Sequence, residues 1–543
     1  MTGRRIPKNR ALALSCLLAA GVLVPQAPAA ADPGSPDLAG RLAAVRTART
    51  INYYPSDAGW SAMWTRFDPV RVDEDLARAA ELGADNVRVV VFPRVFGFPE
   101  PEPEYLGKLD KFVSIADSHG MTVKLTLFDW WSRYKDTRGS ATWANAVIGR
   151  YADDPRVLTV ELKNELSPDD QPAIQWVRRL IPQVRVTAPA MPLTVSVNSG
   201  PSGLARLRRQ LADTPLDYYD YHFYGPSEQA FPELEEVSEV AAPDPVVIGE
   251  TGLSTAASTP GEQAAYLARV FRAAAAAGVR SVAPWTLTDF AAGAIPSNAA
   301  VSLMPAQYRY GLYRTDGTPK PAASVVRAAW SGTDPAVDVL DLGFEGDPAD
   351  SPWRDNLPEF GTAEPTGETA HDGRRSVRFS GTGRDRRGLP SLRISPITPI
   401  RPGQPWHAAA WARGENATGV TEIALSWFDA AGRWIGQDVS GRLPRGTTDW
   451  TELSVDAVAP PAAAGLQLHL KSGDNAGTTW FDDVTLGQPA PAGRLPESPD
   501  VTGDDGLTGG GPDDTVLPAV QDTQPATGDQ DVAGRLEQLP EER

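Results

Sequence analysis

The sequence predicts an α/β protein in which a (β/α)8 TIM barrel is followed by an all-β sandwich and then by a disordered acidic tail. Three changes of pattern along the 543 residues support this prediction. Residues 48–333 alternate between apolar, β-branched runs and Ala-rich amphipathic stretches, as strand–helix units do. Residues 337–487 consist of short alternating strands separated by turn residues, and residues 488–543 are rich in Pro, Gly and Asp.

Eight expected strands and eight expected helices make up the barrel. Several of the strands are continuous apolar runs, which is typical of parallel strands buried on both faces. A doubly wound sheet is the alternative, but it normally places a Gly-rich phosphate-binding turn after its first strand, where this chain has NYYPSDAGW. The expected strands are 50–54, 86–91, 122–128, 157–162, 193–197, 218–224, 245–250 and 279–285. The expected helices are 70–82, 104–119, 140–151, 170–187, 202–212, 229–240, 261–277 and 318–331.

The first 31 residues have the three parts of a signal peptide. A basic start precedes a short apolar run at 11–24, and the small residues of 27–33 offer a cleavage site near Ala31. We therefore expect a secreted, extracellular protein, with a linker and a first helix at 32–47 before the barrel. The only cysteine, Cys16, lies inside the apolar run, so the secreted chain has no thiol for a disulfide or a metal.

The charge of the chain excludes two classes of partner. Its 51 Lys and Arg residues against 69 Asp and Glu residues give a formal net charge of −18. Nucleic acids and anionic lipids both require a basic surface, so we expect neither nucleic acid nor a membrane as a partner. We expect the protein to be a monomer.

Two glutamates directly follow buried-looking strands. Strand 157–162 runs into Asn164 and Glu165, and strand 245–250 ends in Glu250. Catalytic groups of such barrels lie at the carboxyl ends of the strands, where the loops converge. Two carboxylates facing each other there suit glycoside hydrolysis, and in its retaining form they lie about 5–5.5 Å apart. One acts as acid/base, with a pKa raised by burial and by its neighbour's charge, while the other stays ionised as nucleophile. A rim ion pair is the alternative for either residue alone.

Four segments make the barrel resemble clan A of the glycoside hydrolases, close to the cellulase-like family 5 enzymes. They are VLTVELKNE, YDYHFYG, VVIGETG and APWTLTDF, and YGLYRTDGTPKPAA resembles the segment that closes such barrels. The resemblance covers about residues 48–333 and implies the roles of acid/base for Glu165 and nucleophile for Glu250. It also implies that the sugar is cleaved without a required cofactor, and that the substrate is an oligo- or polysaccharide.

The same resemblance implies the residues around the two glutamates. Asn164 would hold the sugar 2-hydroxyl, and Arg88 would keep the nucleophile ionised. His222 and Tyr224 match a His-x-Tyr pair, in which Tyr224 donates to Glu250. Trp285 would form an aromatic floor under the sugar. For Arg88, His222, Trp285 and Asn164, the alternative is a purely structural role as ion-pair partner, core residue, packing residue or turn residue.

The third strand departs from the family. Many family 5 enzymes have a histidine at its end, whereas this chain has Asp129, Trp130 and Trp131. Asp129 is a candidate for binding a sugar hydroxyl, with a loop cap or a rim ion pair as the alternative. The loop tryptophans Trp60, Trp64 and Trp131 are candidate platforms for stacking on sugar rings, and ordinary packing is the alternative for each.

The C-terminal domain resembles a galactose-binding-like jelly roll, the fold of many carbohydrate-binding modules. The matching segments are GFEGD, AHDGRRSVRF and TTWFDDVTL. In related modules, acidic residues such as Glu345 and Asp482 or Asp483 help to hold a structural calcium, with ion-paired acids as the alternative. Possible sugar-stacking residues are Trp353, Trp406, Trp427, Trp434 and Trp450, although alternating strands bury about half of their aromatics.

Other chemistries find no support in the sequence. The five histidines form no HExxH motif, and there is neither a GxSxG nucleophile elbow nor a GxxxxGK[ST] phosphate loop. We expect no metal in the active site. The sequence therefore predicts a retaining β-glycoside hydrolase; a catalytically inactive glycan-binding protein and a transglycosylase are the alternatives.

Overall fold

The computed structural model describes residues 37–333, 340–384 and 388–488. The expected signal peptide and all but the first residue of the expected tail lie outside these ranges. Within them, none of the helices combines the length and the apolarity that a membrane crossing requires.

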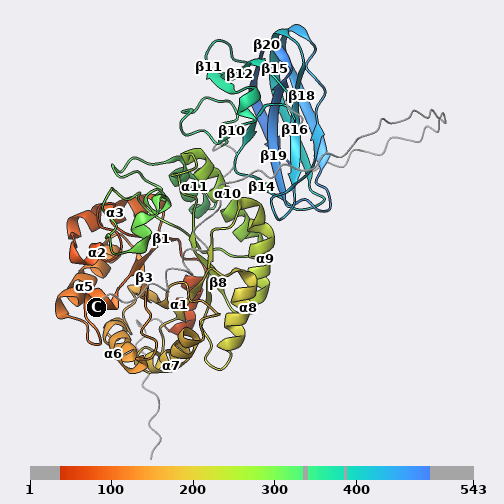
Figure 1. The fold of residues 1–543 in the computed structure, drawn as a ribbon. Helices are drawn as coiled ribbons and strands as arrows, with labels where there is room; N and C mark the ends of the chain where they lie inside the picture. The colour runs from red at the N-terminus through yellow and green to blue at the C-terminus, as the bar shows by residue number, and fades with distance from the viewer. Residues whose placement is uncertain (1–36, 334–339, 385–387, 489–543) are drawn as a thin grey trace, which may run out of the picture. The chain divides into compact units, whose positions relative to one another are not determined.

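Parallel strands form the predicted (β/α)8 barrel, and the helices surround them (Figure 1). The first parallel sheet has the order β1-β2-β3-β4-β5 and the second the order β6-β7-β8-β9. The strands are β1 (Thr50–Asn52), β2 (Asn86–Val90), β3 (Thr122–Phe128), β4 (Val157–Lys163), β5 (Leu193–Thr194), β6 (Ser196–Val197), β7 (Tyr219–Phe223), β8 (Val246–Thr251) and β9 (Val282–Pro284).

The barrel closes between its first and last strands. The Leu287 N–H donates to the Asn52 carbonyl at 3.1 Å, and the Asn52 side chain donates to the Pro284 carbonyl at 3.2 Å. The expected strand 193–197 is divided at Val195 into β5 and β6, so the eight barrel positions are filled by nine short strands. All the carboxyl ends therefore lie at one rim, as parallel strands require.

The helices begin and end at the residues that their sequences favour. Asp68 caps α3 by accepting from the Val70 N–H at 2.9 Å, and α3 ends before Gly83, whose φ is 97°. Thr259 and Glu262 form a capping box at the start of α10. The barrel helices are α1 (Leu38–Val45), α2 (Ala62–Thr65), α3 (Pro69–Leu82), α4 (Pro93–Phe96), α5 (Pro103–Ser118), α6 (Thr137–Ile148), α7 (Gln171–Thr187), α8 (Gly200–Gln210), α9 (Ala230–Ala241), α10 (Pro260–Ala276) and α11 (Pro321–Trp330).

In strand β4, successive side chains point to opposite sides of the strand, and this alternation positions the site. Val160 and Leu162 pack into the apolar core of the barrel, whereas Glu161 bonds to Arg88 inside the strand ring. A charged residue in an otherwise apolar strand therefore faces the barrel axis, and the residues just beyond the strand stand at its rim.

The remaining described residues form a β-sandwich of two antiparallel sheets, as predicted. One sheet has the order β10-β13-β19-β16-β17, with β14 also paired to β19, and the other has the order β11-β12-β20-β15-β18. Their facing sides share an apolar core that includes Phe379, Trp427 and Phe481. The strands are β10 (Trp353–Asn356), β11 (Ala363–Thr366), β12 (Ser376–Thr382), β13 (Ser391–Ile394), β14 (Thr398–Pro399), β15 (Pro405–Ala417), β16 (Val420–Phe428), β17 (Trp434–Val439), β18 (Gly446–Val458), β19 (Gly465–Gly473) and β20 (Asn475–Gly487).

The sandwich tryptophans divide between core and surface. Trp353 and Trp427 are buried, and the Trp427 ring N–H donates to Asp438 at 2.7 Å. These two therefore belong to the core, as the burial of about half of the aromatics of alternating strands allows, and they offer no stacking face. Trp406 and Trp450 are partly buried, and Trp434 on β17 is exposed.

Candidate active site

The guanidinium of Arg88 lies inside the barrel and joins the carboxylates of two strands. Its Nε and Nη2 donate to the two oxygens of Glu161 at 2.7 and 3.1 Å, and its Nη1 donates to Glu250 at 2.5 Å. The same side chain donates to Asn52 at 2.9 Å and to Asn164 at 2.7 Å. The planar fork of arginine allows all five bonds at once, so Arg88 fixes the positions of Glu250 and Asn164 together.

Glu250 closes strand β8 and is held from two sides. Besides Arg88, the Tyr224 hydroxyl donates to its second oxygen at 2.8 Å. Each oxygen of this buried carboxylate thus has a donor, and the negative charge is compensated by a cation. The contact between Tyr224 and Glu250 is the one that the family resemblance implies.

Glu165 follows strand β4 in a left-handed backbone conformation, with φ of 47°. Its N–H donates to the Ser196 hydroxyl at 2.7 Å, and that hydroxyl donates to Asn164 at 3.3 Å. A left-handed conformation costs a non-glycine residue about 1–2 kcal/mol, so the surrounding bonds must hold it in place. The turn aims the Glu165 side chain back towards the barrel axis, where it meets His222.

His222 stands between the two glutamates. Its Nδ1 lies 3.0 Å from Oε1 of Glu165 and 3.5 Å from Oε2 of Glu250. One oxygen of Glu165, one of Glu250 and a ring nitrogen of His222 all lie within 4.8 Å of one another. The two carboxylates therefore face one another across a gap well below the about 6.5–9.5 Å of inverting glycosidases.

The pKa of Glu165 lies below its usual range, contrary to the expected upward shift. Burial raises it, but the hydrogen bond and positive charge of His222 outweigh burial, helped by Arg88 and Lys163. Burial lowers the pKa of His222, but the charges of Glu250 and Glu165 outweigh it, so that pKa is raised. Both shifts favour a charged pair of Glu165 and His222, because the imidazole lies among several carboxylates.

Asp129 bonds to the side chain of Asn164. Its carboxylate accepts from the Asn164 side chain at 3.2 Å, and burial raises its pKa to about 6, against the opposing charge of Lys163. In the part of the chain that the structure describes, this bond takes the place of the loop cap and the rim ion pair that were the alternatives. Asp129 instead orients the amide whose oxygen accepts from Arg88.

Trp285 directly follows strand β9, at the same rim. Its ring lies edge-on to Tyr54 and Trp60, with centroids 6.1 and 6.0 Å away, and Tyr54 stacks on Trp60 at 5.2 Å. This aromatic group forms one wall beside the carboxylates. Trp285 is 8% exposed, so a narrow part of its ring is accessible.

The loop tryptophans differ from the expectation. Trp64 is completely buried, and its ring N–H donates to the Val90 carbonyl at 2.7 Å, so it cannot stack on a sugar. Trp131 is packed between Phe98 and Phe128, and Trp60 is also buried. Trp130, which was not a candidate platform, is 42% exposed and has a left-handed backbone with φ of 55°. The turn that buries Trp131 is what exposes Trp130.

Three charged residues inside the barrel were missed. Lys124 on β3 pairs with Asp220 on β7 and, at 3.5 Å, with Glu161 on β4. All three are buried beneath the two glutamates. The signal was present in the sequence, since each is a charged residue within a buried strand, where an unpaired charge would be costly.

Two groups of described side chains each bring three residues of metal-ligand types close together. Glu161, Asp220 and His222 form one group, and Glu165, His222 and Glu250 form the other. Arg88 and Lys124 already pair with carboxylates of these groups, so the ion pairs account for the clustering. We assign no metal to either group.

The acids expected near a calcium ion in the sandwich bind N–H donors. Glu345 accepts from the N–H groups of Arg374 and Arg375 at 2.6 and 2.8 Å. Asp482 accepts from the His371 N–H at 2.6 Å, and Asp483 pairs with the His371 ring at 2.5 Å. These donors satisfy the carboxylate oxygens without a cation. The calcium site stays a prediction.

Comparison with known proteins identifies the family of the barrel. The family model described as cellulase (glycosyl hydrolase family 5) matches residues 51–290, which include both glutamates and all the residues around them. The barrel is therefore a glycosyl hydrolase family 5 domain, as its resemblance to that family indicated. No curated protein matches the chain.

Several solved structures are similar to the chain. The exo-beta-1,4-mannosidase Op5Man5 from Opitutaceae bacterium strain TAV5 is 19% identical, with a TM-score of 0.43, and the match covers 52% of this chain and 59% of that one. A GH5_18 protein from Streptomyces cattleya, in complex with GlcNAc, is 20% identical over 53% of this chain and 81% of that one, with a TM-score of 0.43. A GH5_18 protein from Bifidobacterium longum subsp. infantis is 19% identical over 53% and 79%, with a TM-score of 0.45.

Proposed function

We propose that the protein is a secreted retaining glycoside hydrolase that cleaves β-glycosidic bonds in oligo- or polysaccharides by double displacement. The observation that carries the proposal is the pair of carboxylates, Glu165 and Glu250, with oxygens within 4.8 Å of each other and of His222. A gap of this size admits the anomeric carbon of a sugar. It leaves no room for the water that an inverting enzyme places between carboxylate and sugar.

Glu250 is the nucleophile in this proposal. Arg88 and Tyr224 each donate to one of its oxygens and together hold the carboxylate in one orientation. Attack on the anomeric carbon forms a glycosyl ester with Glu250 and breaks the bond to the leaving oxygen.

Glu165 is the acid/base. It protonates the leaving oxygen in the first step, and in the second it removes a proton from the water that hydrolyses the ester. In the free protein the proton rests on His222, 3.0 Å away, so it must pass from Nδ1 to Glu165 for the first step. A bound sugar separates Glu165 from solvent and adds to the burial that raises a carboxyl pKa, which favours this transfer.

Asn164 and Asp129 support the sugar side of the site. The amide of Asn164 is oriented by Arg88 and Asp129, and it stands directly before Glu165. Such an amide suits a sugar hydroxyl whose hydrogen bond strengthens as positive charge develops at the anomeric carbon. Asp129 and the exposed face of Trp130 take the place of the histidine that many relatives have after the third strand.

The test is a screen of aryl β-glycosides and of plant, fungal and bacterial polysaccharides with the secreted protein. Glu165→Gln and Glu250→Gln should each reduce kcat/KM by about 10³-fold or more on any substrate found. Glu233→Gln is the matched control, because Glu233 lies on the outer helix α9 and bonds to Tyr221, away from the site. If both active-site variants match the wild type, the assigned roles are wrong.

Two further measurements separate retention from its alternatives. A 2-deoxy-2-fluoro glycosyl reagent should label Glu250, as located by mass spectrometry of the peptide, and proton NMR should show the β-anomer as the first product. Inverted product excludes double displacement. Products longer than the substrate would indicate a transglycosylase, and tight glycan binding without turnover would indicate an inactive binding protein.

A further inference from the structure

A layer of buried charges lies beneath the two glutamates, and the double-displacement steps do not use it. Lys124, Glu161 and Asp220 come from three different strands, and each is almost completely buried. Lys124 pairs with both carboxylates, and Glu161 also accepts from Thr126 at 2.7 Å. Buried charges are costly unless they are paired, so the presence of three of them here indicates a role in the site above them.

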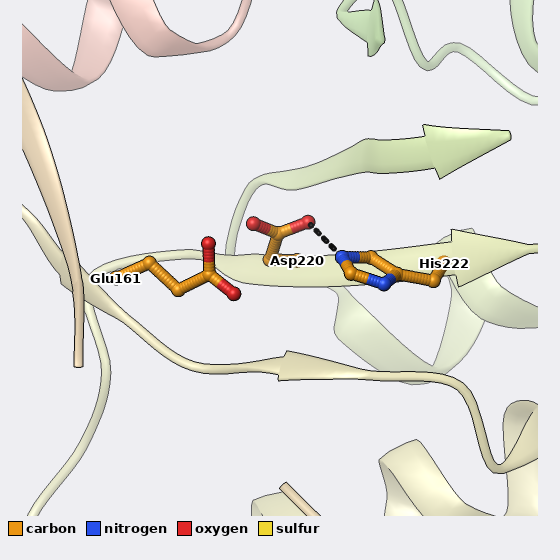
Figure 2. Close-up of side chains that lie close together, drawn as sticks. All are labelled: Glu161, Asp220 and His222. Atoms are coloured by element: carbon orange, nitrogen blue, oxygen red, sulfur yellow. Dashed lines mark ion pairs between the residues drawn. The ribbon is translucent and has the colours of Figure 1, made fainter. Parts of the chain in front are cut away.

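Asp220 faces the far side of the His222 ring. Figure 2 shows its carboxylate directed at the imidazole, with Oδ1 3.9 Å from Nε2. Neither of these two atoms has a hydrogen-bond partner among the described residues, although both are buried. At 3.9 Å the two atoms are too far apart for a direct hydrogen bond, but the negative charge of the carboxylate favours a proton on the nitrogen that faces it.

The neighbouring strand leaves space for this carboxylate. Gly249 on β8 lies beside Asp220, and a Cβ atom at this position would stand 1.9 Å from Oδ1. Any residue other than glycine would therefore displace the Asp220 side chain. The residue directly before Glu250 thus permits the carboxylate to reach the imidazole.

We propose that Asp220 is a positioning residue for the acid/base: its charge stabilises a proton on Nε2 of His222, so that Nδ1 presents a second proton to Glu165. Lys124 anchors Asp220 and moderates its charge. This inference rests on the proposed function for its catalytic consequence, whereas the coupling of Asp220 to His222 can be measured without a substrate.

The charge of His222 reflects every charged group around it. Carboxylates face it from β4, from the turn after β4, from β8 and from β7 itself, and two cations stand behind them on β2 and β3. These groups are Glu161, Glu165, Glu250, Asp220, Arg88 and Lys124. Removing a carboxylate from this set makes the imidazolium easier to deprotonate, and removing a cation makes it harder, because each acts through its charge.

The test is the pH titration of the His222 ring in the full chain labelled with ¹³C-histidine. The five histidines give few signals, and His222→Gln assigns the relevant one. Asp220→Asn should lower the titration midpoint of His222 by about one pH unit, and Lys124→Met should raise it. Opposite shifts cannot come from a general loosening of the barrel, because loosening would move the His222 midpoint in the same direction in both variants.

Asp289→Asn is the matched control. It breaks a buried ion pair of similar kind, 2.8 Å from Lys320, outside this layer. Its melting temperature should fall while the titration of His222 stays at the wild-type midpoint. Shifts of equal sign in the Asp220 and Lys124 variants, or none, would overturn the proposal. If Asp220→Asn does not fold, the Lys124→Met titration alone decides: an unchanged or lowered midpoint overturns it.

The catalytic consequence has its own readout. In Asp220→Asn, the basic limb of the pH profile of kcat/KM should move to lower pH by about the same one unit as the NMR midpoint. An NMR shift without movement of the basic limb overturns the positioning role. A wild type that hydrolyses none of the screened glycosides refutes the proposed function instead, while the NMR titrations still decide whether Asp220 sets the charge of His222.

Discussion

The hydroxyl of Tyr224 donates a 2.8 Å hydrogen bond to Oε2 of Glu250. The bond links the residue that follows strand β7 to the last part of strand β8, and it supplies one of the two donors that hold the carboxylate. Tyr224→Phe keeps the ring and removes only this donor. We expect kcat/KM to fall about 10–100-fold with little change in melting temperature, because a preorganised donor is lost.

Tyr221→Phe is the control for this prediction. Tyr221 lies on β7, the strand that Tyr224 follows, but its hydroxyl bonds to Glu233 on the outer helix α9. Its activity should stay close to wild type, as measured on the same aryl glycoside. Equal activity of the two variants would mean that the Tyr224 hydroxyl has no part in the reaction.

Arg88→Met should lower both stability and activity. The substitution leaves Glu161 and Glu250 buried without their shared cation, and such a loss costs about 3–5 kcal/mol of unfolding free energy. Urea unfolding measures this cost, and circular dichroism below the transition checks that the variant is folded. An unchanged unfolding free energy would show that other groups compensate the two carboxylates.

Asp129→Asn should stabilise the protein at neutral pH. Burial raises the Asp129 pKa to about 6, whereas an unfolded aspartate has a pKa of about 3.9. Between these values the folded protein binds a proton that the unfolded chain has released, so this carboxyl lowers stability as pH rises from about 4 to about 6. The asparagine keeps an oxygen that can accept from Asn164 and does not ionise.

The variant should therefore match the wild type near pH 4 and exceed it by about 1–3 kcal/mol at pH 7. Urea unfolding at the two pH values measures the difference. A gain of the same size at both values would point to a packing effect and against the raised pKa.

The tryptophans after the first and third strands should behave in opposite ways. Trp130→Ala removes an exposed ring, so we expect an unchanged melting temperature and a KM for oligosaccharides raised about 3–10-fold by the lost stacking. Trp64→Phe removes a buried ring N–H bond to Val90, so the melting temperature should fall and KM should stay constant. A KM effect in the Trp64 variant alone would reverse this assignment.

Much of the barrel was predictable because its signals are local. The expected helix 70–82 is observed as Pro69–Leu82, and the expected strand 122–128 as Thr122–Phe128. Cap residues such as Asp68 and the apolar period of each strand act within a few residues, so one chain is enough to detect them. The order of the strands then places Glu165 and Glu250 at one rim.

Other features depend on residues far apart in the chain. The break of the fifth strand at Val195 and the burial of Trp64 follow from packing between elements, which a local pattern does not contain. The proton affinity of Glu165 was predicted in the wrong direction, since burial alone raises it and the opposing charge comes from His222, 57 positions away.

The sequence alone established the alternation of strands and helices. It also established the rim at which the strands end and the two acidic residues that lie there. These features follow from short-range periodicity and chain order. The tertiary structure alone decided which charges meet. Lys124 and Asp220 are 96 positions apart, and closure of the barrel brings them together under His222. Electrostatic interaction depends on distance through space and on burial, and neither quantity is written in the order of the residues.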